Sequence, residues 1–171
     1  MDMDVLFENT YVRDKALAKE FYGYYYLKRK LQVFLQIMLC ICFLANLILA
    51  ILDLPYSVLV LITVPAWFLI HFVSYFSGVN AMVKMDREIC GDDLKVTVIV
   101  TEDGLQIAGS VGGEIKIGFD KVKDVIQTKN LILVRSKARL VYILRKDSFS
   151  IGTKEAFQSF LKDKGITVKG K

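Results

Sequence analysis

Two long uncharged stretches dominate the pattern of hydrophobic and polar positions along the chain. Residues 31–52 carry no charge, and neither do residues 54–79 when His71 is neutral. Each stretch is at least as long as the roughly 20 apolar residues that a helix needs to cross the hydrocarbon core of a bilayer. Neither has the polar face at helical spacing that a helix in a soluble bundle would show. The pattern therefore predicts a transmembrane helical hairpin over residues 31–79, with helices at about 31–52 and 56–79.

Residues 1–30 are predicted to form an interfacial amphipathic helix that leads into the hairpin. Apolar side chains recur at helical spacing from Val12 to Phe21, and Asn9 or Thr10 precedes them as a candidate helix cap. Aromatic rings and cations gather at the end of this segment, and further cations follow the hairpin, as is typical of membrane–water interfaces. The predicted membrane-interface and headgroup residues are Phe21, Tyr22, Tyr24, Tyr25, Tyr26, Lys28, Arg29, Lys30, Lys84 and Arg87.

The positions of the basic residues predict the orientation of the hairpin. Its short turn at residues 53–57 contains no Lys or Arg, whereas basic residues lie just before the first helix and just after the second. Basic residues near the ends of spans mark the cytoplasmic side of a membrane. We therefore expect a multi-pass protein with both termini in the cytoplasm.

Short alternating segments follow a helical exit or linker at residues 80–93. Valines alternate with other residues over 96–100, and Glu102-Asp103-Gly104 is typical of a hairpin turn. More short strands come next, and an amphipathic helix with Phe157 on its apolar stripe closes the pattern. Residues 94–171 are thus predicted to form a small antiparallel β-barrel or sandwich capped by a C-terminal helix, which makes the fold class α+β.

Polar side chains within the predicted spans are few. Asn46 is expected to form a hydrogen bond across the helix pair. His71 is ionisable at membrane depth and is therefore a functional candidate, although its place near the cytoplasmic end of its helix favours a structural role. Cys40, Cys42 and Cys90 form no disulfide framework, because two lie in a span and the third in a compartment expected to be reducing.

Catalytic and metal-binding constellations are not evident in the sequence. The single histidine excludes His-based triads and His-rich metal sites from the β-rich region. The glycine-rich run 109–113 lacks the Lys-Ser or Lys-Thr ending and the following helix of a phosphate-binding loop. The carboxylates of Asp92, Asp93, Asp120 and Asp124 are not spaced to gather around one cation. We expect a protein that is not an enzyme and holds no metal or cofactor.

Charge is distributed unevenly between the two halves of the chain. Residues 94–171 hold 15 basic and 8 acidic side chains, whereas residues 1–93 hold 8 basic and 10 acidic ones. A basic domain tethered to a membrane is attracted to anionic lipids. The same charge can also serve solubility alone. Because of the membrane tether, nucleic acid is a less favoured partner than lipid. The candidate basic face consists of Arg135, Lys137, Arg139, Arg145 and Lys146.

Three short motifs accompany this order of elements: the Glu-Asp-Gly turn, the corner Gly-Phe-Asp-Lys-Val at 118–122, and Leu-Arg-Lys-Asp-Ser-Phe at 144–149. Together they resemble the YcxB-like family of bacterial membrane proteins. Lys146 and Phe149 match a Pro-Lys-x-x-Phe segment of that family, whereas Arg145 stands where the family usually has proline. The resemblance implies a hairpin in the bacterial inner membrane followed by a cytoplasmic pleckstrin-homology-like (PH-like) domain over 94–171. It implies little about activity.

Three functions agree with these observations. The first is a non-enzymatic membrane protein whose basic PH-like domain binds lipid, peptide or protein. The second is an immunity protein that protects its own cell from a bacteriocin or another membrane-active toxin. The third is an accessory subunit of a transporter or channel, which would require association with other subunits or copies because two helices cannot enclose a pore. Membrane lipids are expected partners in each case.

Overall fold

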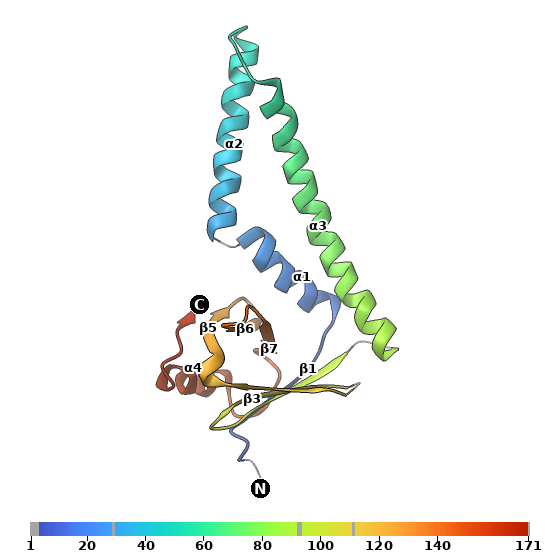
Figure 1. Cartoon of the computed structure of the whole chain (residues 1–171), viewed down its shortest axis with the longest axis vertical. Helices are drawn as coiled ribbons and strands as arrows, with labels where there is room; N and C mark the ends of the chain where they lie inside the picture. Colours follow the sequence, from blue (N-terminus) through green and yellow to red (C-terminus); the bar gives the residue numbers. More distant parts are fainter. Residues whose placement is uncertain (1–3, 29, 92–93, 111, 171) are drawn as a thin grey trace. The chain divides into compact units, whose positions relative to one another are not determined.

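The computed structural model describes residues 4–28, 30–91, 94–110 and 112–170 (Figure 1). The fold is α+β: helices, two of them long and apolar, precede most of two β-sheets and a C-terminal helix. The chain divides into two compact units. We call residues 21–82 the hairpin unit, and residues 1–20 together with 83–171 the β-unit.

The hairpin unit consists mainly of two long helices. The preceding helix α1 (Lys15–Gly23) starts in the β-unit and continues into the short π-helix η1 (Tyr24–Lys28). Helices α2 (Lys30–Ile51) and α3 (Val58–Cys90) then form the hairpin; α2 lies close to the predicted 31–52, whereas α3 continues eleven residues beyond the predicted end at 79. The predicted exit segment is not a separate helix over its described part, because α3 runs without a break to Cys90.

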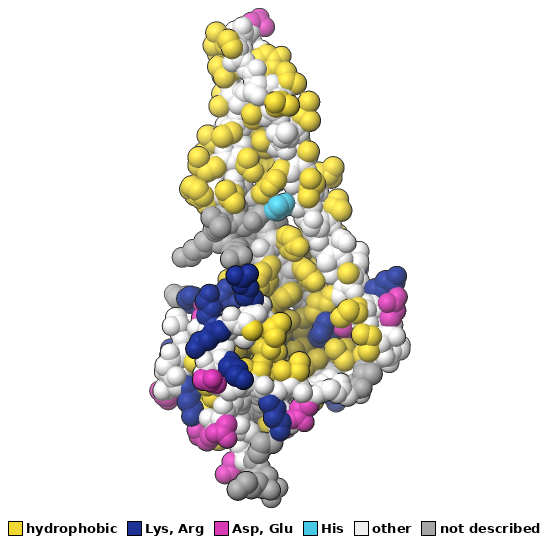
Figure 2. Space-filling model, viewed as in Figure 1, with side chains coloured by type: hydrophobic (Ala, Val, Ile, Leu, Met, Phe, Trp, Pro, Cys, Tyr) yellow, Lys and Arg dark blue, Asp and Glu magenta, His cyan; other side chains and the backbone are white. Residues whose placement is uncertain are grey.

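Both hairpin helices are long and apolar enough to cross a membrane. The candidate spans Val33–Ile51 and Val58–Cys90 have mean hydropathies of 2.6 and 2.0. Almost none of their side chains are buried within the chain, whereas the core helix of a soluble protein would be mostly covered. Figure 2 shows hydrophobic side chains spread over the hairpin and charged side chains of both signs on the β-unit.

Asn46 forms two hydrogen bonds at the turn of the hairpin. Its side-chain amide donates to the carbonyl of Cys42 at 2.9 Å, and its side-chain oxygen accepts from the backbone N–H of Ser57 at 2.9 Å. The second bond satisfies a backbone donor at the start of α3, where helices leave such donors without a partner. Asp53 adopts a positive φ of 52°, a conformation that aspartate tolerates better than most residues.

Two sheets build the β-unit. Sheet A has the antiparallel order β4-β3-β2-β1-β8, and sheet B has the order β7-β6-β5-β9, in which only the β5–β9 pair is parallel. Sheet A comprises β1 (Phe7–Val12), β2 (Lys95–Val100), β3 (Gly104–Gly109), β4 (Glu114–Gly118) and β8 (Phe149–Ile151). Sheet B comprises β5 (Val122–Gln127), β6 (Leu131–Ser136), β7 (Val141–Arg145) and β9 (Val168–Lys169). The 3₁₀ turn η2 (Phe119–Lys121) joins the sheets, and α4 (Lys154–Asp163) follows β8.

The prediction of a helix capped by Asn9 or Thr10 at the start of the chain is wrong. Residues Phe7–Val12 form strand β1, and the first helix begins only at Lys15. The segment FENTYV alternates buried and outward-facing residues with a period of two, which fits a strand and not a helix. Its partner β2 lies more than 80 residues away, in register from Phe7↔Val100 to Val12↔Lys95. Local spacing in the sequence does not reveal such a distant partner.

Strand β1 connects the two sheets and the C-terminal helix through its inward side chains. The ring of Phe7 lies 5.4 Å from that of Phe157 in α4. The buried side chain of Asn9 donates to the carbonyl of Arg145 at 2.7 Å and accepts from its N–H at 3.1 Å. The hydroxyl of Tyr11 donates to the carbonyl of Ile143 at 2.7 Å. Two polar side chains thus bond the backbone edge of β7, where a neighbouring strand would otherwise pair.

Helix α4 has the amphipathic character expected from its sequence. Thr153 caps its first turn by accepting from the N–H of Ala156 at 3.2 Å, and Phe157 and Leu161 are fully buried. Glycine ends the helix at Gly165, where φ is +75°. Helix α4 therefore supplies core side chains to the β-unit.

Candidate functional site

The hairpin is an insertion between two neighbouring strands of sheet A. Val12, the last residue of β1, pairs with Lys95, the first residue of β2, and the next N–H along the chain, that of Arg13, donates to the carbonyl of Leu94 at 2.9 Å. The segments that lead into and out of the hairpin therefore start from the same end of two paired strands. Any membrane crossed by the hairpin would have the N-terminal strand and the C-terminal region on one side.

A buried ion pair joins the end of β1 to the end of α3 within the β-unit. Arg13 Nε lies 3.1 Å from Asp86 Oδ2, and the Asp86 side chain is only 2% exposed. Burial raises the pKa of the nearby Tyr11 phenol; the charge of Arg13 lowers that pKa and the charge of Asp86 raises it. This ion pair holds the two segments together, because the guanidinium of Arg13 compensates a carboxylate that is almost completely removed from water.

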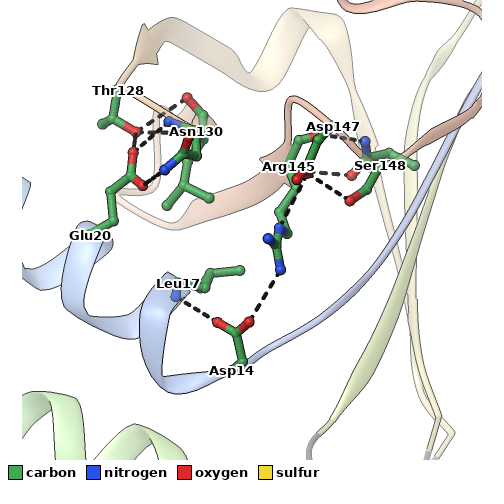
Figure 3. A network of polar contacts seen from close by, with 10 residues as sticks. Asp14, Leu17, Glu20, Thr128, Asn130, Arg145, Asp147 and Ser148 are labelled. Atoms are coloured by element: carbon green, nitrogen blue, oxygen red, sulfur yellow. Dashed lines mark hydrogen bonds and ion pairs between the residues drawn. The ribbon is translucent and has the colours of Figure 1, made fainter.

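Helix α1 is attached to sheet B by carboxylates (Figure 3). Asp14 caps the helix by accepting from the N–H of Leu17 at 2.7 Å, and its other oxygen lies 3.3 Å from Arg145 Nη1. Arg145 also contacts Asp147 through Nε at 3.3 Å. The guanidinium of Arg145 is therefore shared between two acids, one just before α1 and one two residues beyond the end of β7.

Glu20, six residues after Asp14, binds the turn between β5 and β6. It accepts from the Thr128 hydroxyl at 2.5 Å, from the Asn130 N–H at 2.7 Å and from the Asn130 side chain at 2.8 Å (Figure 3). Burial alone would raise the pKa of Glu20, but the hydrogen bonds from Asn130 and Thr128 lower it overall. Lys146 donates to the Thr128 carbonyl at 2.5 Å, and burial lowers the pKa of its ammonium group.

The structure separates the five residues of the predicted basic face. Arg135 forms a bidentate ion pair with the buried carboxylate of Asp124, in which Nε donates at 2.6 Å and Nη2 at 2.5 Å. Lys169 adds a contact at 2.8 Å, and the Arg135 and Lys169 hydrogen bonds lower the pKa of Asp124 to about 2 against the opposing effect of burial. Arg145 and Lys146 lie at the other end of the β6–β7 hairpin, about 13 Å along the strands at the usual rise per residue.

Lys137 and Arg139 instead project from the exposed turn between β6 and β7, beside two lysines that the sequence reasoning did not select. The N–H of Lys137 donates to the carbonyl of Lys121 at 2.8 Å, and Lys123 follows at a bulge in β5. All four side chains are exposed, and none has an ion pair or hydrogen bond with another side chain in the described part of the chain. We call Lys121, Lys123, Lys137 and Arg139 the basic cluster. The strand register brings them together, and the sequence alone does not give that register.

The predicted aromatic belt packs on itself and on α3. Tyr22 and Tyr26 are stacked with ring centres 6.1 Å apart, and a Cβ added at Gly78 would lie 2.6 Å from the Tyr22 ring. The imidazole of His71 stacks on the Trp67 ring at 3.9 Å and meets the Tyr26 ring edge-on at 6.4 Å. These contacts give His71 a packing role. The remaining predicted belt rings also lie against neighbours: Phe21 against Tyr25 at 5.0 Å, and Tyr24 against Tyr25 at 5.5 Å.

The predicted basic anchors are described only in part. Arg29 and the side chains of Lys28 and Lys30 lie outside what the structure describes. Lys84 and Arg87 are exposed near the end of α3, and Lys84 lies 3.5 Å from Glu88. Within the described residues, no three His, Cys, Asp or Glu side chains gather as a metal site.

Similarity to known proteins agrees with the resemblance inferred from the motifs. Residues 100–161 match the model of the YcxB-like protein family. The YcxB-like match runs from the end of β2 to α4, so it includes η2 and the β6–β7 hairpin but not β1 or the membrane-length helices. No curated protein and no solved structure matches the chain significantly.

Proposed function

We propose that this chain is a non-enzymatic integral membrane protein of the bacterial inner membrane that presents the β-unit to the cytoplasm as a binding module. The observation that carries the proposal is the position of the hairpin between paired strands β1 and β2. An apolar insertion of this kind, with almost no side chains buried within the chain, needs an apolar solvent such as lipid. Because it is a hairpin, both of its ends lie on the same side of the membrane. The β-unit would then fold around the two ends of its own anchor.

The cytoplasmic orientation rests on charge. The hairpin turn around Asp53 has no Lys or Arg, whereas Lys84 and Arg87 follow the second span. Basic residues near spans favour the cytoplasmic side.

We also propose that the β-unit is a PH-like domain. The support for this is the combination of two sheets with a C-terminal helix and the YcxB-like match.

The basic cluster is the surface that we propose for ligand binding. Its four exposed cations form no ion pair with an acid among the described residues, and each Lys or Arg near an anionic leaflet contributes about 1 kcal/mol of attraction. A membrane anchor in the same chain would keep the β-unit tethered to the bilayer at all times. Anionic lipid headgroups are therefore the ligand that the charges and the anchor favour over a soluble acidic peptide.

The anchor and its orientation are tested by thiol labelling in intact bacterial cells. One variant keeps only Cys90, with Cys40 and Cys42 replaced by serine; a second lacks all three and carries Tyr56→Cys in the exposed hairpin turn. A membrane-impermeant maleimide should label the cysteine at position 56 in intact cells, and Cys90 only after permeabilisation. Labelling of Cys90 in intact cells, or recovery of the protein in the soluble fraction, would refute the proposal.

A further inference from the structure

Sheet A ends in an uncovered strand. Strand β4 pairs with β3 on one side, and no other strand in the described part of the chain pairs with its outer side. The opposite terminal strand β8 has only three residues, and in sheet B side chains of β1 bond the edge of β7. An uncovered edge presents unpaired N–H and C=O groups and is a template for another strand.

The side chains of β4 differ between its two faces. Ile115 lies opposite Ile107 and Ile117 opposite Leu105, so these apolar side chains share one face of the sheet. Ile117 is buried, but Ile115 is 52% exposed. On the other face, Glu114 and Lys116 form an ion pair at 3.1 Å that is too exposed to contribute much stability.

The side chains of β4 are complementary to those of a second β4 when the two strands pair in one particular antiparallel register. If two copies of β4 pair around Ile115, each Ile115 lies opposite the other, and Glu114 of each copy lies opposite Lys116 of its partner copy. Pairing around Lys116 or around Glu114 would instead place like charges opposite each other, which is destabilising. The favoured arrangement has a two-fold axis, as do most homodimers.

We propose that the outer edge of β4 binds β4 of a second copy of this chain, so that sheet A continues from one copy into the other. This inference goes beyond the proposed function, because it depends on neither the lipid ligand nor the orientation of the hairpin. Its consequence for the anchor is that each dimer contains two hairpins.

Cysteine cross-linking of the intact protein in its own membranes tests the pairing and its register. In a background without native cysteines, Ile115→Cys should form a dimer-linking disulfide under mild oxidation, because directly opposed Cβ atoms lie about 5 Å apart. The matched control is Ile151→Cys, which is 41% exposed on β8 at the opposite edge of the same sheet and should not cross-link. Equal cross-linking at positions 115 and 151 would overturn the proposal.

Charge exchange tests the register separately. In the Ile115→Cys protein, Glu114→Lys places the new lysine of each copy opposite Lys116 of the other copy. The two-fold symmetry creates this repulsive pair twice, so self-association should weaken about tenfold. The double variant Glu114→Lys/Lys116→Glu restores opposite charges across the interface and should restore cross-linking. Unchanged cross-linking in the single variant, or no recovery in the double variant, would contradict this register. Because both positions are exposed, these variants should keep the fold, which protease resistance of the β-unit would verify.

Discussion

Most apolar side chains are buried in the β-unit and exposed in the hairpin unit. Residues Leu131–Val134 of β6 are at most 1% exposed, whereas Ile51 and Leu59 of the hairpin are each 73% exposed. Polar contacts differ as well: several of those in the β-unit join segments more than 70 residues apart, as Arg13 and Asp86 do, while Asn46 bonds within its own turn. The β-unit thus has the contacts that hold a fold together in water, and the hairpin has the surface of a segment that relies on lipid.

The largest effect is expected from removing the buried ion pair at the hairpin junction. Asp86→Ala leaves Arg13 without its buried partner and should destabilise the β-unit by about 3–5 kcal/mol. Lys84→Ala, on the same helix in an exposed pair with Glu88, should cost less than about 1 kcal/mol. Pulse proteolysis of the detergent-solubilised protein in urea measures both. Similar losses in the two variants would mean that the junction does not stabilise the β-unit.

A second test concerns the contact of β1 with sheet B. Asn9→Ala removes both bonds to the Arg145 backbone and leaves a donor and an acceptor unsatisfied, so we expect a loss of about 3 kcal/mol. Thr10→Ala removes an outward-facing hydroxyl that contacts Thr97 and should cost about 1 kcal/mol or less. The same proteolysis assay compares them. If Asn9→Ala is as mild as Thr10→Ala, β1 does not connect the sheets in the way described.

Acid should weaken the β-unit through Asp124. Its pKa of about 2 in the folded state lies below the unfolded value of about 3.9, so the folded state binds fewer protons. The resulting stability, about 2.5 kcal/mol, is fully present above about pH 5 and is lost as the pH falls towards 2. Asp124→Asn should therefore lose less stability than the unmodified protein between pH 5 and pH 3. Parallel losses in the two proteins would exclude this role for Asp124.

The smallest expected effect concerns the basic cluster. Arg139→Gln should weaken recruitment of vesicles containing phosphatidylglycerol to the full chain in neutral nanodiscs about fivefold, which corresponds to one cation at about 1 kcal/mol. Lys129→Gln removes an exposed charge outside the cluster and should have less effect. Added salt should reduce the difference between the two variants. Equal weakening by both would point to general surface charge and not to a site.

The comparison between the units also explains what the sequence could predict. The hairpin follows from composition and length, and α4 follows from the helical spacing of Phe157 and Leu161, so both are local properties. Strand β1 depends on a partner more than 80 residues away, and its period-two pattern FENTYV was the signal that the helical interpretation overlooked.

The candidate basic face also depends on long-range pairing that local sequence patterns do not reveal. The five predicted cations lie on one hairpin of the sequence, but acids from other segments pair with some of them and so determine which cations are free at the surface. Asp124 binds Arg135 and Asp14 binds Arg145, whereas Lys121 joins Lys137 only through the pairing of β5 with β6. Long-range pairing therefore determines the surface, and neither composition nor local spacing contains that information.

The central claim is that the membrane-length hairpin is inserted between two paired strands. Its most direct test is a disulfide between Thr10→Cys and Thr97→Cys, whose hydroxyl oxygens lie 3.1 Å apart across β1 and β2. In membranes and without native cysteines, this pair should link readily within one chain. The control pair Thr10→Cys/Lys116→Cys, two strands further across the sheet, should not. Failure of the 10–97 pair to link above that control would contradict the insertion of the hairpin within sheet A.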